Sequence, residues 1–61
     1  MIDVTLMNGQ IMSLNDDLIE TVQETPDTVI TLTNARRIIV KESRQEIKDL
    51  VKIARREIHI P

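Results

Sequence analysis

The chain has 61 residues and a formal net charge of −2, and it contains no cysteine and no aromatic residue. This length fits one domain, expected to span residues 1–61, and the absence of cysteine excludes disulfides and thiolate metal sites. Without aromatic rings the chain lacks platforms for stacking single-stranded nucleic acids, and its acidic excess makes nucleic acid an unfavoured partner. No apolar run approaches the roughly 20 residues of a membrane span, and the first residues do not resemble a secretory signal. We therefore expect a cytoplasmic protein.

The first predicted element is a β-hairpin. Residues 2–7 alternate apolar and polar side chains, as a half-buried strand does, and residues 10–14 form a second β-like run. Asn8–Gly9 lies between them, and both residues tolerate positive φ, which predicts a two-residue type I′ turn. Such a turn would pair Leu6 with Ile11 across the hairpin.

A polar break at Asn15–Asp17 follows, and we expect its adjacent acids to face solvent. Residues 18–25 predict a third strand, because two threonines and a valine favour strand over helix. Pro26 pre-sets φ for a type I turn over Thr25–Thr28. Residues 28–33 are almost all β-branched and predict a fourth strand.

A second two-residue turn is predicted at Asn34–Ala35, although alanine, unlike glycine, meets a steric cost at positive φ. It leads into a fifth strand at residues 36–41 and would pair Ile30 with Ile39. In this register the last two strands are apolar on both faces. Because one helix covers only one face of a sheet, we predict either a sheet curled like a barrel or a homo-oligomer.

The chain is predicted to end in a helix over residues 44–58. Ser43 and Glu46 have the spacing of a capping box, directly before an apolar segment with helical periodicity. The apolar stripe, which Ile53 widens, consists of Ile47, Leu50, Val51, Ala54 and Ile58. The predicted fold is therefore α+β: a five-stranded antiparallel β-meander over residues 2–41, open or curled like a barrel, followed by one C-terminal amphipathic helix.

No group of residues predicts catalysis. The chain has no nucleophile motif such as G-x-S-x-G, and its single glycine excludes a glycine-rich phosphate-binding loop. Asp16 and Asp17 with Glu20 or Glu24 lack the spacing of a cation-binding loop, and His59 has no serine or cysteine beside it in the sequence. We therefore expect no enzymatic activity, no metal site and no cofactor.

Basic side chains form the candidate partner-binding surface. They begin around the predicted fifth strand and continue along the helix. The full candidate set is Arg36, Arg37, Lys41, Arg44, Lys48, Lys52 and Arg55. These residues could contact RNA phosphate or an acidic protein surface, and the helix face could dock on an anionic membrane surface. The alternative is that they form a solvated strand edge and a solvated helix face.

Several segments together resemble a known family. They are residues 2–9 (IDVTLMNG), Leu14–Asn15, residues 18–22 (LIETV), residues 24–34 (ETPDTVITLTN) and residues 40–43 (VKES). Over roughly residues 1–52 the sequence resembles the small flagellar-operon protein family FlbD, also known as the swarming motility protein SwrD. One difference is Ala35, because the family usually has Asn-Gly at the second turn.

The resemblance implies a non-catalytic protein that supports motility, especially the power of the flagellar motor under load. The implied partners are stator or basal-body proteins on the cytoplasmic side, and the implied location is the cytoplasm at the flagellar basal body. The resemblance assigns no binding residues.

The predicted architecture also resembles the carbon-storage regulator family of RNA-binding dimers, which regulate gene expression after transcription. Those proteins bind RNA with basic residues on the first strand and near the end of the last. Here residues 2–7 contain an aspartate and no base, so only Arg36, Arg37, Lys41 and Arg44 could serve. RNA binding is therefore the alternative to protein–protein interaction.

Overall fold

The structure is a computed structural model that describes residues 1–58. Within this range the chain forms five antiparallel strands and a C-terminal helix, which confirms the predicted fold class. The elements are β1 (Ile2–Thr5), β2 (Ile11–Leu14), β3 (Ile19–Glu24), β4 (Thr28–Leu32), β5 (Arg37–Val40) and α1 (Arg44–Ile58). A short 3-10 helix, Asp16–Leu18, connects β2 to β3. His59 and the side chains of Glu57 and Ile58 lie outside the described part of the chain.

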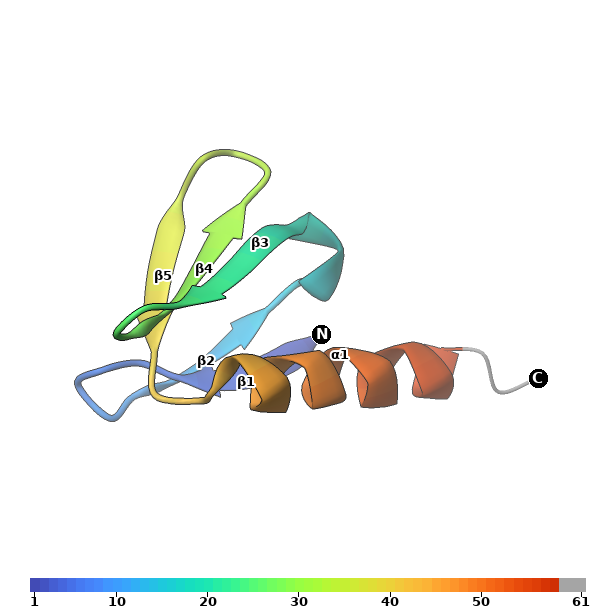
Figure 1. Ribbon diagram of the computed structural model, residues 1–61. Helices are drawn as coiled ribbons and strands as arrows, with labels where there is room; N and C mark the ends of the chain where they lie inside the picture. The colour runs from blue at the N-terminus through green and yellow to red at the C-terminus, as the bar shows by residue number, and fades with distance from the viewer. Residues whose placement is uncertain (59–61) are drawn as a thin grey trace.

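The strands form two sheets that are not closed into a barrel (Figure 1). One sheet contains β1 and β2, and the other has the order β3-β4-β5. The sheets are joined at the end of β1, where Leu6 forms an antiparallel bridge with Val40 and the amide of Lys41 donates to the carbonyl of Thr5 at 2.8 Å. Helix α1 packs against β1 and β3, so it contacts both sheets.

The predicted two-residue turn between β1 and β2 is a three-residue loop. The amide of Gly9 donates to the carbonyl of Leu6 at 2.9 Å, and the amide of Leu6 donates to the carbonyl of Gln10 at 2.8 Å. Gly9 has a φ of +88°, so a turn is followed by a left-handed residue that forms a bulge. The Asn8 side chain accepts a hydrogen bond from the Gln10 amide at 3.0 Å, which stabilises the end of the loop.

The loop between β4 and β5 repeats this geometry. The amide of Ala35 donates to the carbonyl of Leu32 at 2.9 Å, and the amide of Leu32 donates to the carbonyl of Arg36 at 2.8 Å. The Asn34 side chain accepts from the Arg36 amide at 3.0 Å. Ala35 occupies the left-handed position, with a φ of +70°. Because a Cβ is crowded in this conformation, glycine suits the position better than alanine.

The extra loop residue shifts both hairpins from the predicted register. Ile11 pairs with Thr5, one residue earlier than predicted, and Ile30 pairs with Ile38 rather than with Ile39. A shift of one residue moves every side chain of a strand to the other face. Accordingly, Ile11 is 66% exposed and Ile39 is 47% exposed, whereas Ile38 is buried.

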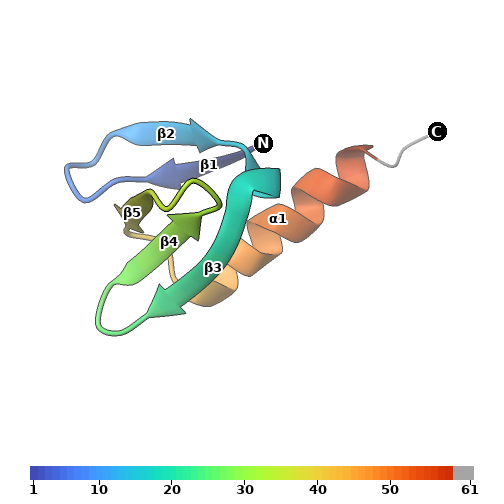
Figure 2. The same cartoon turned by 90° about the horizontal axis from the view of Figure 1, so that it is seen from above.

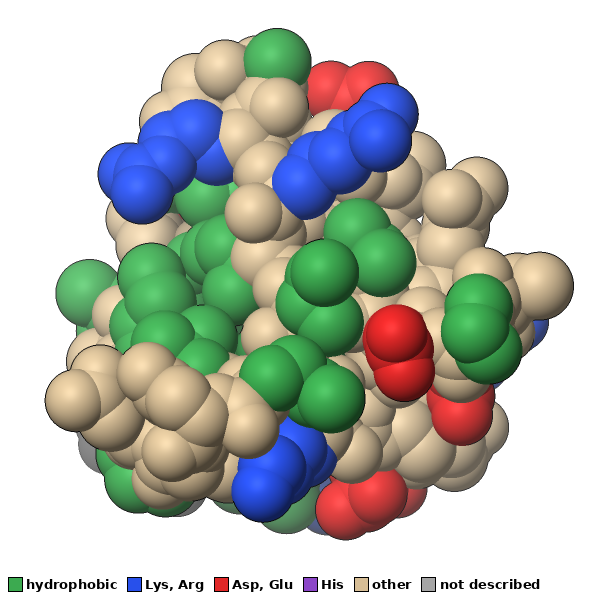
Figure 3. All heavy atoms as spheres, turned by 90° about the vertical axis from the view of Figure 1, so that its left-hand side faces the viewer, with side chains coloured by type: hydrophobic (Ala, Val, Ile, Leu, Met, Phe, Trp, Pro, Cys, Tyr) green, Lys and Arg blue, Asp and Glu red, His purple; other side chains and the backbone are tan. Residues whose placement is uncertain are grey.

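The observed register removes the basis of the predicted homo-oligomer. The outer face of the three-stranded sheet carries the aliphatic residues Val29 and Ile39 among polar neighbours. These neighbours are Thr21, Gln23, Thr31 and Arg37. On the side of the molecule shown in Figure 3, hydrophobic side chains lie among charged and neutral ones. The prediction of two apolar faces is therefore wrong, and the oligomeric state stays a prediction.

The connection between β3 and β4 is tight, as predicted, but it is not closed as a type I turn. The amide of Thr25 donates to the carbonyl of Asp27 at 3.2 Å, and the Thr25–Pro26 peptide bond is cis. In many type I turns the amide of the fourth residue donates to the carbonyl of the first. The hydrogen bond between Thr25 and Asp27 is a different one, so the predicted turn type is wrong.

Substitutions at the two left-handed positions are expected to change stability in opposite directions. Gly9→Ala should destabilise the fold by about 1 kcal/mol, the cost of the backbone conformation alone, because the added Cβ meets no atom within 4 Å. Ala35→Gly should stabilise it by about 0.5 kcal/mol, since relief of the crowded Cβ exceeds the added entropy of the unfolded chain. Urea denaturation of both variants beside the wild type measures the two changes. A destabilised Ala35→Gly variant would contradict this loop geometry.

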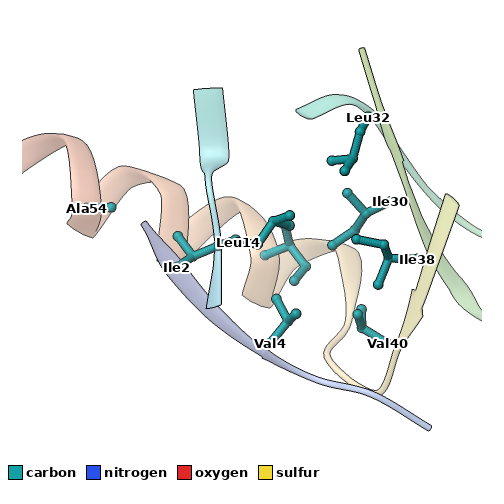
Figure 4. Packing of buried hydrophobic residues seen from close by; sticks show 9 residues of the cluster. Ile2, Val4, Leu14, Ile30, Leu32, Ile38, Val40 and Ala54 are labelled. Carbon is teal, nitrogen blue, oxygen red and sulfur yellow. The ribbon is translucent and has the colours of Figure 1, made fainter. Parts of the chain in front are cut away.

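The core lies where the two sheets and α1 meet, and its side chains point toward one another in Figure 4. The buried hydrophobic residues are Ile2, Val4, Leu14, Ile30, Leu32, Ile38, Val40, Ile47 and Ala54. The predicted helix stripe is confirmed at Ile47 and Ala54, which are buried, and at Leu50 and Val51, which pack against the core. Ile53 was expected to widen the stripe, but it is 53% exposed, so this part of the prediction is wrong.

A capping box and a carboxylate from β3 cap the N-terminal end of α1. The amide of Glu46 donates to the hydroxyl of Ser43 at 3.1 Å, and the amide of Ser43 donates to the carboxylate of Glu46 at 3.1 Å. The predicted capping box is therefore confirmed. Glu24 adds a cap that the sequence did not indicate, because its carboxylate accepts from the Arg44 amide at 2.8 Å. This bond holds the first turn of α1 against the end of β3.

Candidate partner-binding groove

A groove of about 390 Å³, here called the α1–β3 groove, lies between α1 and β3. Seen from above in Figure 2, β3 lies between β4 and α1. The groove is lined by Asp16, Ile19, Val22, Arg44, Ile47, Lys48, Val51, Lys52 and Arg55. These side chains form an aliphatic floor, a row of four bases and one buried carboxylate.

Helical spacing builds the row of bases. Arg44, Lys48 and Lys52 follow one another at intervals of four residues, and Arg55 follows three residues later. Residues three and four apart lie on the same face of a helix, so all four project from one side of α1. With a rise of 1.5 Å per residue, the row is about 16 Å long. All four side chains are exposed, so their charges are available to a ligand in the groove.

Aliphatic side chains from both elements form the floor. On α1, Ile47 is buried and Val51 is half-buried, and on β3 both Ile19 and Val22 are half-buried. Val22 lies on the inner face of its sheet because it pairs directly with the core residue Ile30. The floor therefore continues the hydrophobic core out to the surface.

The structure brings the four candidate bases of α1 together and places the other three elsewhere. Arg36 lies in the β4–β5 loop, Arg37 begins β5, and Lys41 follows the end of β5. The strand thus separates Lys41 from the two arginines. On the face shown in Figure 3, basic side chains are separated by hydrophobic and neutral ones rather than forming one patch.

Asp16 is the groove residue whose position the sequence did not indicate. It was expected to face solvent, but it is only 4% exposed, so that prediction is wrong. Its Oδ1 accepts a hydrogen bond from the amino group of Met1 at 2.9 Å. Its Oδ2 lies 3.8 Å from Nε of Arg55 and has no hydrogen-bond partner among the described residues. The hydrogen bond from the amino group lowers the pKa of Asp16 although burial opposes it, so the carboxylate is charged at neutral pH.

A second carboxylate fixes α1 relative to β1. Glu42 accepts hydrogen bonds from the amide and the hydroxyl of Thr5, both at 2.8 Å. Burial alone would raise the pKa of Glu42, but the two hydrogen bonds from Thr5 outweigh it and lower the pKa. Because Glu42 comes directly before the capping residue Ser43, these bonds position the start of α1 and with it the groove.

The groove offers positive charge, aliphatic surface and one carboxylate. Among the side chains that the structure describes, those of residues 1–56, no three acidic or histidine groups lie close enough together to hold a metal ion. Within residues 1–58, no helix is both long and apolar enough to cross a membrane. This combination of cations and aliphatic side chains suits the binding of an anionic, partly apolar ligand.

Comparison with known protein families matches residues 1–59 to the family described as FlbD: flagellar and swarming motility proteins. No curated protein and no solved structure matches the sequence significantly. The family match covers both sheets, α1 and every residue of the groove. It confirms the resemblance carried by residues 24–34 and the other segments. The chain therefore belongs to the FlbD family of flagellar and swarming motility proteins.

Proposed function

We propose that this chain is a non-enzymatic accessory protein that raises the power of the flagellar motor by binding another protein. Membership in a flagellar and swarming motility family is the observation that carries the motility role. The proposed partner is a stator or basal-body protein, and the proposed place of action is the cytoplasmic side of the flagellar basal body.

The α1–β3 groove supports binding as the mode of action. Lys48 and Lys52 are exposed, and neither forms an ion pair with another described residue. The half-buried side chains of Ile19, Val22 and Val51 leave aliphatic surface beside these charges. A partner that covers this surface would gain both hydrophobic contact and charge pairing.

The test is the motility of a deletion strain in media of increasing viscosity, with flagella counted in the same cells. We expect a normal number of flagella and a loss of swimming speed that grows with viscosity, because the proposed defect is in motor power. A plasmid copy of the wild-type chain should restore speed.

Other outcomes would contradict the proposal in different ways. A loss of flagella would indicate a role in assembly or in gene expression instead. Unchanged flagellar number and unchanged motility would argue against any motor role. RNA binding through the bases around β5 would then be the next activity to measure.

A further inference from the structure

The α1–β3 groove carries a clear excess of positive charge. Its four bases face one acid, Asp16, and that acid already accepts a hydrogen bond from the amino group of Met1 and lies near Arg55. Lys48 and Lys52 have no acidic partner among the described residues. An occupant of the groove must therefore bring negative charge to its basic side.

The floor of the groove selects against two classes of anionic ligand. It contains only aliphatic side chains beside Asp16, so it offers no aromatic surface on which an RNA base could stack. The bases also line a hollow rather than a flat face, whereas a bilayer surface is broad and flat. A polypeptide segment can place aliphatic side chains into such a hollow and carboxylates along its rim.

A second copy of this chain is a poor match for the groove. Acids near the helix and the hairpin already accept hydrogen bonds within their own chain. They are Asp3 from Ser13, Glu24 from Arg44, Glu42 from Thr5, Glu46 from Ser43 and Asp49 from Gln45. Asp17, Glu20 and Asp27 are exposed but lie on different elements, in the 3-10 helix, in β3 and in the β3–β4 turn. The described residues of a second copy thus offer no cluster of free acids to the basic groove, which favours a different protein as the partner.

We propose that the α1–β3 groove binds an acidic, aliphatic-rich segment of a different protein. Its aliphatic side chains cover Ile19, Val22 and Val51, and its carboxylates pair with Lys48 and Lys52. Asp16 Oδ2 is buried at the groove without a hydrogen bond, and a donor from the segment supplies its missing partner. The proposal rests on the proposed function in that both require a protein partner, and it adds the chemistry and location of the contact.

Photo-crosslinking in motile cells tests this proposal. The chain carries p-benzoylphenylalanine either at Arg44, on the rim of the groove, or at Arg37, on the outer face of β5. We expect an adduct from position 44 to a segment of another protein that is rich in acidic and aliphatic residues, and none to that segment from position 37. The crosslinked peptides are sequenced by mass spectrometry.

A matched pair of charge reversals makes the test specific. Lys48→Glu/Lys52→Glu reverses two charges in the groove, and Arg36→Glu/Arg37→Glu reverses two charges outside it. We expect the first pair to lower the yield of the position-44 adduct about tenfold and the second to leave it nearly unchanged, because only the first turns pairing into repulsion. Circular dichroism of both variants checks that they fold.

Several outcomes would overturn the proposal: an adduct to a second copy of the chain, to lipid, to RNA or to a segment without acids. Absence of any adduct from position 44, in cells whose motility the labelled chain restores, would overturn it too. Its failure is distinguishable from failure of the proposed function. A non-flagellar protein with the stated segment at position 44 would support the groove and contradict the motor role. A flagellar protein crosslinked only from position 37 would support the motor role and contradict binding at the groove.

Discussion

Replacing Ile47 with alanine is expected to destabilise the fold by about 3 kcal/mol, the range found for large-to-small changes in a packed core. Ile47 is 1% exposed and is one of the largest fully buried side chains. It belongs to the core cluster through which α1 packs against both sheets. A chain of this size has a total stability of roughly 3–9 kcal/mol, so this variant should be largely unfolded at moderate urea or at elevated temperature.

Ile53→Ala is the matched control, because it removes the same atoms from the same helix at a site that is 53% exposed. It should change stability by less than about 0.5 kcal/mol. Thermal and urea unfolding followed by circular dichroism measure both variants. Equal effects at the two positions would contradict the burial of Ile47 and the exposure of Ile53.

Asp16→Asn is expected to destabilise the fold by about 2 kcal/mol at neutral pH, because it removes a buried charge that pairs with an amino group and an arginine. The side chain keeps its shape, so the loss reports on charge rather than on packing. Asp16 accepts from the amino group of Met1 at 2.9 Å and lies 3.8 Å from Arg55. Asp17→Asn, the same change at its exposed neighbour, is the control and should have little effect.

The effect of Asp16→Asn should depend on pH in a defined direction. The pKa of Asp16 in the folded chain is lowered, chiefly by the hydrogen bond from the amino group. A carboxylate with a lowered folded pKa contributes stability above its unfolded pKa of about 4, and this contribution is lost as pH falls through the folded pKa. The gap between wild type and variant should therefore be constant from neutral pH to about 5 and close at lower pH.

Urea midpoints measured between neutral and strongly acidic pH would show this closure. Glu42, whose pKa is also lowered in the folded chain, should contribute a further fall in wild-type stability in the same acidic range. A gap between wild type and Asp16→Asn that persists unchanged at the lowest pH would mean that the carboxylate is not stabilised by its cationic neighbours.

Signals that act within a few residues were sufficient to predict the five strands and α1, but not the 3-10 helix Asp16–Leu18. Ser43 and Glu46 lie three residues apart, and both hydrogen bonds of the capping box are formed. The β-branched run at residues 28–33 contains β4, which ends at Leu32. These predictions succeed because the groups that stabilise each element are neighbours in the sequence.

The strand register was not fixed by local signals. Asn8–Gly9 is compatible with a two-residue turn and with a three-residue loop that has glycine at the bulge, so turn chemistry alone does not choose between them. The tertiary core decides, since the observed register places Ile2, Val4 and Leu14 together on the buried face. The observed register buries more apolar residues than the predicted one, so counting them for each register would have favoured it.

For the α1–β3 groove, local signals predicted the row of bases but not its position in the fold. The spacing of Lys48 and Lys52 already placed them on one side of the helix. Their position beside β3 depends on how α1 packs, which no short segment encodes. Asp16 was missed because the group that holds it, the amino group of Met1, lies 15 residues away in the sequence.

The proposed role of the α1–β3 groove is tested by the torque of single flagellar motors in a deletion strain that expresses groove or control variants. Lys48→Glu/Lys52→Glu and Arg36→Glu/Arg37→Glu change the net charge equally, and only the first pair lies in the α1–β3 groove. Bead assays at high load should give torque near the deletion level for the groove variant and near wild type for the control, at equal protein levels. Wild-type torque from a folded groove variant would contradict the claim that this groove binds the partner through which the chain supports motility.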